Sequence, residues 1–374
     1  MQQAHKEYSW VMIPTTDCNA QCQYCFQKKT HKNNWSLEDM RIIFEKMRIF
    51  AIHNHIGKYR FYWQGGEIMM LGTSFFDDAA HIQAQILANI EISNSIQTNL
   101  LAYNKTWGRV IKKYFRGIVS TSVDYPNLYR RIQAGGNAEY MTEWQKRYAR
   151  ASDDGIRVNV ISIPNEESIK IGAKAFLDYF ANRLKVKGLQ INLAFPINGG
   201  KTLKSKFYKY LPSLNAFMKE LAVEYLHHYE TTEFALSPIR EIMRTMRGEC
   251  LWQGPCIFAK CCASQFMTIG PRGECSVCDC WLDVGKDRIF GNVLTDDIDE
   301  LIRHPFRNEL FERTESIINK ECRGCDYLHM CYGGCPIRAY SFKNNLRSRD
   351  FYCSTYKQIF TSVKENIEKQ RSGA

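Results

Sequence analysis

Six strand-like stretches alternate with helical stretches between residues 9 and 195, and this alternation constrains the fold more than any other feature of the chain. Successive strand–helix units with right-handed crossovers build a parallel sheet. We therefore predict an α/β fold, a partial TIM-like (β/α)6 barrel that curls without closing. The predicted strands are Ser9–Ile13, Arg60–Trp63, Ile92–Thr98, Gly117–Val123, Val158–Ile163 and Leu189–Phe195; the predicted helices are Leu37–His53, Phe75–Asn89, Thr106–Phe115, Met141–Ser152 and Glu166–Leu184.

The sequence changes character after the predicted barrel. Pro196–Gly200 and the basic stretch that follows indicate a linker, and from about Cys250 the helical period fades while cysteines accumulate. We expect this last part to be held together largely by metal, because metal binding can supply folding free energy. Later helices are predicted at Pro212–Tyr229, Ser237–Arg247 and Ser354–Gln370, and the predicted domains are a barrel at 1–200, a helical linker at 201–249 and a cluster-binding domain at 250–374.

The composition limits where the chain works and what it binds. No apolar run approaches 18 residues and the N-terminus has no apolar signal region, so neither a membrane span nor export is expected. Fifteen cysteines in such a chain indicate reduced metal ligands in a cytoplasm. The net charge of +11 comes from scattered basic residues, so nucleic-acid binding is unlikely, while a basic docking face for an acidic electron donor of the ferredoxin or flavodoxin type remains open.

Cys18, Cys22 and Cys25 follow the first predicted strand with the spacing C-x3-C-x2-C. Three thiolates can bind three irons of a [4Fe–4S] cube and leave the fourth iron open to an external ligand. A zinc knuckle is the alternative, but zinc pairs usually read C-x2-C and need a fourth ligand, for which His31 is the nearest candidate. The spacing favours the cluster.

A second group of cysteines lies near the C-terminus. Cys322, Cys325, Cys331 and Cys335 are spaced C-x2-C-x5-C-x3-C, and 17 residues separate the last of them from Cys353. With Tyr24 in the first group, both patterns resemble the radical S-adenosylmethionine superfamily and its SPASM extension, from about Trp10 to Cys353. The resemblance implies that the open iron binds S-adenosylmethionine, whose cleavage yields a 5′-deoxyadenosyl radical, and that two further [4Fe–4S] clusters are present, three in all.

The order of the cysteines is similar to that of the anaerobic sulfatase-maturating enzymes, which implies a ligand set for each auxiliary cluster. One set is Cys256, Cys262, Cys278 and Cys335; the other is Cys322, Cys325, Cys331 and Cys353. Four cysteines remain, which we interpret as free thiols: Cys250, Cys261, Cys275 and Cys280. Cys261 competes with Cys262 for one position, and Cys275 and Cys280 compete with Cys278, which the Gly273-x4-Cys278 spacing favours.

Polar residues follow the predicted strands, at the sheet edge where such folds place their sites. Gln64-Gly65-Gly66-Glu67 resembles the family's GGE motif, which holds the amino group of the cofactor; Ile68 replaces the usual proline. An ordinary strand–helix turn is the alternative. Two glycines at this point permit close backbone approach, and a carboxylate can accept a hydrogen bond from an ammonium group.

Two more strand ends resemble the sulfatase-maturating subgroup. The sequence QTN at 97–99 is followed by Leu100 instead of glycine, and SVD at 122–124 is followed by Tyr125 instead of glycine. The resemblance implies contacts with the cofactor or the substrate from Asn99, Ser122 and Asp124; a strand-end cap and an Asx-turn are the alternatives for the first and last of these. We expect the departures to lie where the substrate binds, which disfavours a sulfatase substrate.

Two further side chains are candidates. Arg130 or Arg131 can reach the cofactor carboxylate as a bidentate donor, unless the pair belongs to a solvated helix face. Asp279 follows Cys278 directly, as in the sulfatase-maturating enzymes, where this residue is proposed as a general base. It could take a proton once a radical forms on the substrate. A structural hydrogen-bond anchor is the alternative.

Together these features predict a radical S-adenosylmethionine oxidoreductase that oxidises or cross-links a side chain of a peptide or protein, as maturases of ribosomally made peptides do. Anaerobic sulfatase maturation, or dehydrogenation or epimerisation of a small aminocyclitol or sugar, are the alternatives. A pure electron carrier is disfavoured, because it needs no cofactor cleft. Only 17 residues precede Cys18, too few for a leader-binding domain of about 80 residues. We therefore expect a separate delivery protein or direct recognition by the barrel.

Overall fold

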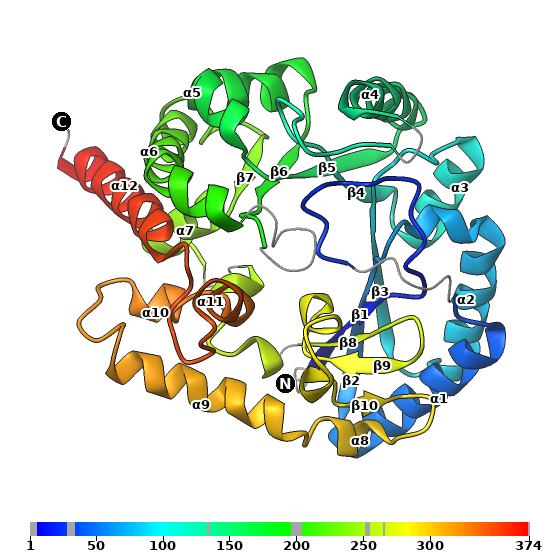
Figure 1. The fold of residues 1–374 in the computed structure, drawn as a ribbon. Coiled ribbons are helices and arrows are strands. Elements are labelled where there is room, and N and C mark those ends of the chain that lie inside the picture. The colour runs from blue at the N-terminus through cyan, green and yellow to red at the C-terminus, as the bar shows by residue number, and fades with distance from the viewer. Residues whose placement is uncertain are drawn as a thin grey trace.

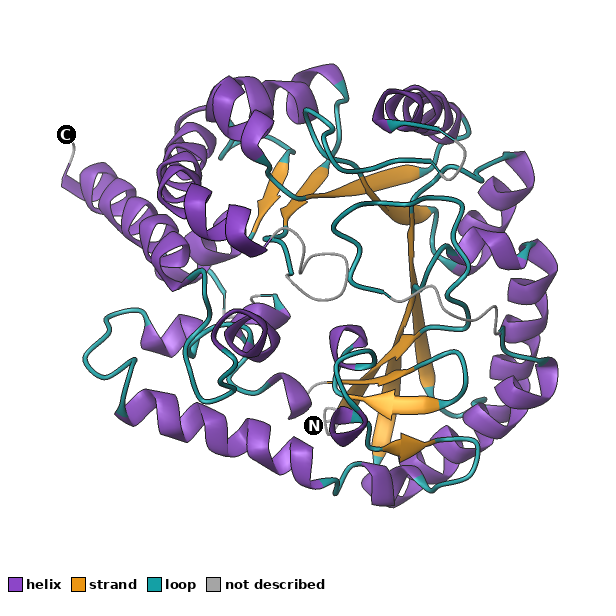
Figure 2. Ribbon diagram, viewed as in Figure 1, coloured by secondary structure: helices purple, strands orange, loops and turns teal. Residues whose placement is uncertain are grey.

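The computed structural model describes residues 6–27, 34–132, 135–195, 204–250, 255–264 and 266–372. Helices surround a curved, open sheet (Figures 1 and 2), and the ten strands follow the order β10-β9-β8-β1-β2-β3-β4-β5-β6-β7. The predicted partial barrel is therefore confirmed. The predicted linker at 196–200, and the residues up to 203, lie outside the described residues.

The barrel strands pair in parallel from β1 to β7, each beside the next one in the sequence. All six predicted strands are present; β7 was not predicted because it has only three residues. The strands are β1 Lys6–Met12, β2 Ile56–Trp63, β3 Glu91–Thr98, β4 Ile118–Ser122, β5 Arg157–Ser162, β6 Gly188–Ile191 and β7 Ala235–Ser237.

Helices cover the outside of these strands (Figure 2). The first of them begins at a capping box, in which the Ser36 hydroxyl accepts from the Asp39 amide and the Asp39 carboxylate accepts from the Ser36 amide. The helices of this half are α1 Leu37–Asn54, α2 Thr73–Ile86, α3 Lys105–Tyr114, α4 Asn137–Asp153, α5 Glu166–Asp178, α6 Lys204–His228 and α7 Ile239–Met246.

The C-terminal segment continues the barrel sheet beyond β1, which the sequence did not predict. Strand β8 (Phe266–Ile269) pairs in parallel with β1, and β9 (Glu274–Ser276) and β10 (Gly291–Asn292) follow antiparallel. These strands are only two to four residues long, so they show too few alternations to be recognised as strands. The proposed division at residues 200 and 250 stays a prediction.

Helices enclose the rest of this segment. They are α8 Ile298–Leu301, α9 Pro305–Asn319, α10 Leu328–Cys331, α11 Pro336–Lys343 and α12 Cys353–Ser372, and α12 packs along α6 (Figure 1). Shorter helices are η1 Ile68–Leu71, η2 Tyr179–Arg183, η4 Cys256–Phe258, η5 Cys262–Ser264, η6 Asp279–Trp281 and η7 Lys286–Arg288. Among the described residues, no helix combines the length and apolarity needed to cross a membrane.

Apolar side chains pack in the C-terminal segment, which we expected to be held together largely by metal. Trp281 is fully buried, and its ring centroid lies 4.9 Å from that of Phe306 and 5.6 Å from that of Tyr340. This core is continuous with that of the barrel. The fifteen-residue helix α9, which supplies Phe306, was not predicted.

Replacing Phe306 with alanine should lower the free energy of unfolding by about 3–5 kcal/mol, because the side chain is only 3% exposed. Phe311 in the same helix is 41% exposed, so Phe311→Ala should cost under about 0.5 kcal/mol. Urea unfolding of the anaerobically purified proteins, followed by circular dichroism, measures both. Equal midpoints for the two variants would contradict the buried position of Phe306.

Candidate active site

The loop that carries Cys18, Cys22 and Cys25 follows β1 and lies directly against the glycine pair that follows β2. The Gly66 amide donates to the Thr15 carbonyl at 3.0 Å, and the Glu67 amide donates to the Asp17 carbonyl at 2.6 Å. A Cβ atom on Gly66 would lie 2.3 Å from the Asp17 oxygen. Side chains larger than hydrogen are therefore excluded here, and the two predicted motifs form one structure at the carboxyl ends of β1 and β2.

Asn99 contacts this cysteine loop from the end of β3. Its side-chain nitrogen lies 3.8 Å from Cys18 Sγ and donates to Asn19 Oδ1 at 2.7 Å, while its Oδ1 accepts from the Leu101 amide at 2.9 Å. The side chain is thus oriented so that an N–H group faces a predicted iron ligand. Donors to cluster sulfur stabilise its negative charge, so Asn99 fits a site for an iron–sulfur cluster.

Glu67 is oriented inward rather than toward an open cleft. The side chain is 1% exposed, and its carboxylate accepts from the amides of Met69 at 2.9 Å and Asn99 at 2.6 Å and from the Thr98 hydroxyl. Burial raises its pKa, and these three donors oppose that effect. The carboxylate therefore joins the loop after β2 to the end of β3, and we infer that it shapes the cofactor site through the backbone.

Tyr24, Asp124 and Arg130 form a buried network on the other side of the cysteine loop. Asp124 is fully buried; it accepts from the Tyr24 hydroxyl, from Arg130 Nε at 3.1 Å and from the Ile163 amide at 2.9 Å. Arg130, only 7% exposed, lies with its guanidinium 5.3 Å from the centre of the Tyr24 ring. The Arg130 guanidinium, which we predicted to bind the cofactor carboxylate, therefore already binds the carboxylate of Asp124.

Leu100 and Tyr125, which replace glycines of the subgroup's motifs, have different surroundings. Leu100 is fully buried and adopts φ 68°, so it packs into the core, contrary to the expectation that it would lie beside the substrate. The Tyr125 ring stacks on that of Tyr179 with centroids 3.5 Å apart. Ser122 Oγ accepts from Gln97 at 2.8 Å, which joins the ends of β3 and β4.

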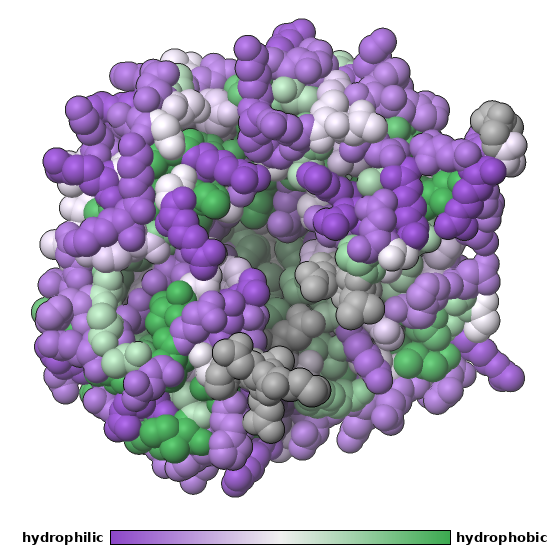
Figure 3. All heavy atoms as spheres, turned by 180° about the vertical axis from the view of Figure 1, so that it is seen from behind, coloured by the Kyte–Doolittle hydropathy of each residue, from purple (hydrophilic) through white to green (hydrophobic). Residues whose placement is uncertain are grey.

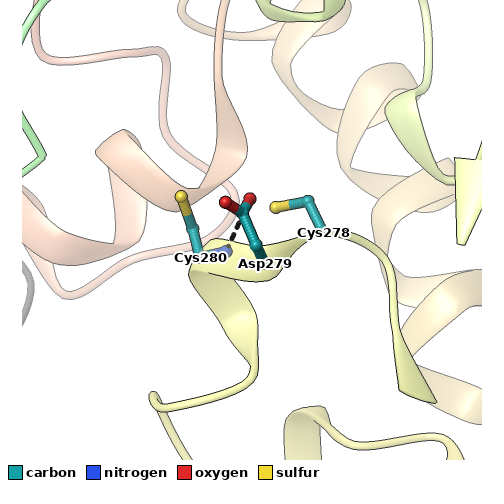
Figure 4. A group of neighbouring side chains, drawn as sticks. All are labelled: Cys278, Asp279 and Cys280. Atoms are coloured by element: carbon teal, nitrogen blue, oxygen red, sulfur yellow. Dashed lines mark hydrogen bonds between the residues drawn. The ribbon is translucent and has the colours of Figure 1, made fainter. Parts of the chain in front are cut away.

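Asp279 lies where the C-terminal segment meets the barrel. Gln64 Nε2, beside the glycine pair, donates to Asp279 Oδ2 at 3.1 Å, and the Cys280 amide donates to Oδ1 at 3.0 Å. Figure 4 shows the carboxylate between the thiols of Cys278 and Cys280. Burial raises the pKa of Asp279 to about 6. A partly exposed carboxyl with such a pKa can exchange a proton near neutral pH.

The first predicted auxiliary set is brought together by the fold. Burial raises the pKa of Cys262 well above its usual value, and the nearby thiols of Cys278, Cys335 and Cys256 raise it further. The nearby Cys278 thiol raises the pKa of Cys256, whose side chain is exposed, and the pKa of Cys335 is raised to about 12 by burial, with Cys278 and Cys256 adding to it. Bound metal would relieve this crowding, because it replaces the protons.

The second predicted set lines a single cavity. Its four cysteines come from the α9–α10 connection, from α10 and from the first turn of α12, and aromatic rings of Tyr327, Tyr356 and Phe360 close it. The lining thiols are Cys322, Cys325, Cys331 and Cys353. Four thiols around one cavity fit a fully ligated cluster.

The structure also separates the surplus cysteines. Cys275 is fully buried in β9 and its thiol donates to the Gly273 carbonyl at 3.4 Å, so it faces the core. Cys250 has the Thr245 hydroxyl 3.9 Å away. Burial raises the pKa of Cys261, while nearby backbone amides and arginines lower it, and its thiol adds to the raised pKa of the adjacent Cys262. Cys280 also approaches the first set, because both Cys278 and Cys335 raise its pKa.

These features resemble those of radical S-adenosylmethionine enzymes with a SPASM domain, and comparison with known proteins supports this class. The family model for SPASM, an iron–sulfur cluster-binding domain, matches residues 261–326. The chain is similar to the cysteine-type anaerobic sulfatase-maturating enzyme of Clostridium perfringens, with 26% identity over 92% of this chain and 93% of that protein. The serine-type enzyme of Klebsiella aerogenes is 21% identical over 92% of this chain and 82% of its own length.

The fold agrees with these sequence relatives. The solved structure of native anSMEcpe with bound AdoMet and Cp18Cys peptide superposes with a TM-score of 0.81 at 19% identity, covering 99% of this chain and 100% of that one. The likeness therefore extends through both the barrel and the C-terminal segment.

Gly66→Ala should remove roughly a third of the bound iron, because its Cβ would displace the backbone that leads into Cys18. Gly72→Ala is the matched control: Gly72 also follows β2, and with φ 83° an alanine there is strained, but nothing lies within 4 Å of its added Cβ. Iron and sulfide assays of anaerobically purified protein measure the effect. Equal iron in both variants would show that the close contact at Gly66 is dispensable.

Cys262→Ala should lower auxiliary iron and Cys261→Ala should leave it unchanged, because the thiols of the set raise the pKa of Cys262, whereas backbone amides and arginines lower that of Cys261. Iron per chain, together with electron paramagnetic resonance of the reduced protein, distinguishes the two. The opposite outcome would make Cys261 the ligand.

Proposed function

We propose that this enzyme oxidises a side chain of a peptide or protein substrate. Its cofactors are S-adenosylmethionine and three [4Fe–4S] clusters, which when bound supply a radical that removes a hydrogen atom and a route for one electron. The observation that carries the proposal is the position of Asp279, which contacts Gln64 of the predicted cofactor site at 3.1 Å and directly follows Cys278 of the predicted auxiliary set. A carboxylate thus joins the predicted cofactor site to the predicted auxiliary site.

The chain's own residues then have separate tasks. Asp279 takes the proton that leaves the substrate carbon after hydrogen abstraction, and Gln64 holds its carboxylate in place. Loss of one hydrogen atom, one proton and one electron is a two-electron oxidation of the substrate. Asn99 orients an N–H group toward Cys18. Glu67 and the Tyr24–Asp124–Arg130 network hold the loops around the cofactor site.

Formylglycine formation on a sulfatase is the specific reaction that the observations favour. Both relatives named above are sulfatase-maturating enzymes, and the match to the first covers nearly the whole of both chains. The buried position of Leu100 removes one of the two reasons for doubting such a substrate. We further propose a cytoplasmic location and an acidic ferredoxin- or flavodoxin-type donor, which the net charge of +11 would suit.

Anaerobic incubation with S-adenosylmethionine, a reductant and the Cp18Cys peptide, or its serine counterpart, tests this proposal. Formylglycine formation predicts an aldehyde that hydrazide reagents capture and mass spectrometry locates at the cysteine or serine. A cross-link would give a product without an aldehyde and with altered proteolytic fragments. Cofactor cleavage without any change in either peptide would exclude the sulfatase reaction and leave other peptides or small molecules as candidates.

Asp279→Asn should keep cofactor cleavage but lower product formation by about 10²-fold or more, because the substrate carbon can no longer lose its proton to this group. With deuterated substrate, 5′-deoxyadenosine should still acquire deuterium. Asp287→Asn, with a side chain 70% exposed in the same segment, is the control and should form product normally. Near-normal product from Asp279→Asn would make this residue structural, and loss of cofactor cleavage would assign it to cofactor binding or to the auxiliary site.

A further inference from the structure

Cys280 is a buried thiol that the two predicted ligand sets leave unused. It lies in η6, two residues after Cys278, and is only 6% exposed. Its sulfur, the Cys278 sulfur and a carboxylate oxygen of Asp279 all lie within 4.8 Å of one another. Figure 4 shows the three side chains on one side of the short helix. A second thiol is thus available where the predicted cluster needs one.

The contacts of Cys280 belong to the first auxiliary set. The Cys278 sulfur lies within 4.8 Å of its sulfur, and the charges of Cys278 and Cys335 both raise its pKa. Cys275, three residues before Cys278, lies in β9 and its thiol donates to the Gly273 carbonyl, so it points away from the first auxiliary set. The distance in sequence alone therefore does not explain why Cys280 lies near Cys278. The tight turn of η6 brings the two residues together.

We propose that Cys280 is an alternative ligand of the first auxiliary cluster, so that either Cys278 or Cys280 completes the site with Cys256, Cys262 and Cys335. This inference rests on the auxiliary ligand set proposed above. One thiolate occupies the iron and the other stays a protonated thiol beside it, because one iron of a fully ligated cube takes a single protein ligand.

The exchange would affect the proposed base. The Cys280 amide donates to Asp279 Oδ1 at 3.0 Å, and Asp279 is covalently between the two cysteines. Moving the metal bond from one thiol to the other therefore changes the backbone that holds the carboxylate. The pair of thiols gives the auxiliary site two ligation states that differ in the position of Asp279 relative to Gln64.

Measuring iron content tests whether Cys280 can replace Cys278 as a ligand. The test uses full-length protein in which Cys18, Cys22 and Cys25 are replaced by alanine. Only auxiliary iron then remains, about eight atoms per chain. In this background Cys278→Ala and Cys280→Ala should each retain about eight irons, and the double variant should retain about four. Cys278→Ala combined with Cys275→Ala is the matched control and should also retain about eight. The reduced Cys278→Ala protein should show an electron paramagnetic resonance signal with shifted g-values.

Loss of about four irons from Cys278→Ala alone would overturn the proposal, and so would full iron in the Cys278/Cys280 double variant. If the double variant does not fold, the single Cys278→Ala variant decides by its iron content and its resonance signal. Absence of auxiliary iron from the background protein itself would overturn the auxiliary ligand sets as a whole, which is a different failure from that of Cys280.

Discussion

The pairing of β8 with β1 is the contact on which the rest of the site depends. The register runs from Ser9 opposite Phe266 to Met12 opposite Ile269, and the Ile13 amide continues it by donating to the Ile269 carbonyl at 2.9 Å. Strand β1 leads into the cysteine loop, and β8 leads through β9 to Cys278. Because β8 runs parallel to β1 and β9 returns antiparallel beside β8, the segment that carries Cys278 is attached to a strand about 250 residues earlier in the chain. The hydrogen bond from Gln64 to Asp279 is a second contact between these two parts of the chain.

Two buried arginines of the C-terminal segment favour the binding of metal there. Arg338, 1% exposed, donates to the Leu193 carbonyl at 2.7 Å and lies 3.7 Å from Asp350. Arg313, 3% exposed, donates to the carbonyls of Leu346, Gly333 and Ser348, and the charges of Cys335, Cys262, Asp350 and Cys322 act on it. A buried guanidinium is costly without opposite charge. Thiolate-bound clusters would add to the charge of Asp350, so these buried arginines favour the metal-bound state of the segment.

Sequence patterns predicted what depends on periodicity and spacing, and missed what depends on tertiary contacts. The first six strands and their helices, the cysteine sets and the glycine pair were all visible, because each has a repeat or a fixed spacing. Strands β7–β10 have two to four residues and do not alternate regularly with long helices, and so they were missed. Residue type also could not show which polar groups find partners within the chain: Glu67 and Arg130 look like cofactor ligands in the sequence, yet their buried groups are bonded to Asn99 and Asp124. Cys280 was interpreted as a free thiol because the sequence does not show that the turn of η6 brings it close to Cys278.

Leu100 shows how a departure from a motif can concern packing rather than substrate. A left-handed backbone at φ 68° costs an L-residue about 1–2 kcal/mol, which explains why glycine is usual at such a position. Fully burying a leucine side chain contributes about 1.5–3 kcal/mol, and Leu100 is fully buried. The two effects are of similar size, so the exchange of glycine for leucine is tolerated without any contribution from a ligand. We therefore expect substrate preference to depend on residues other than Leu100, and the proposed base Asp279, between Cys278 and Cys280, is a candidate.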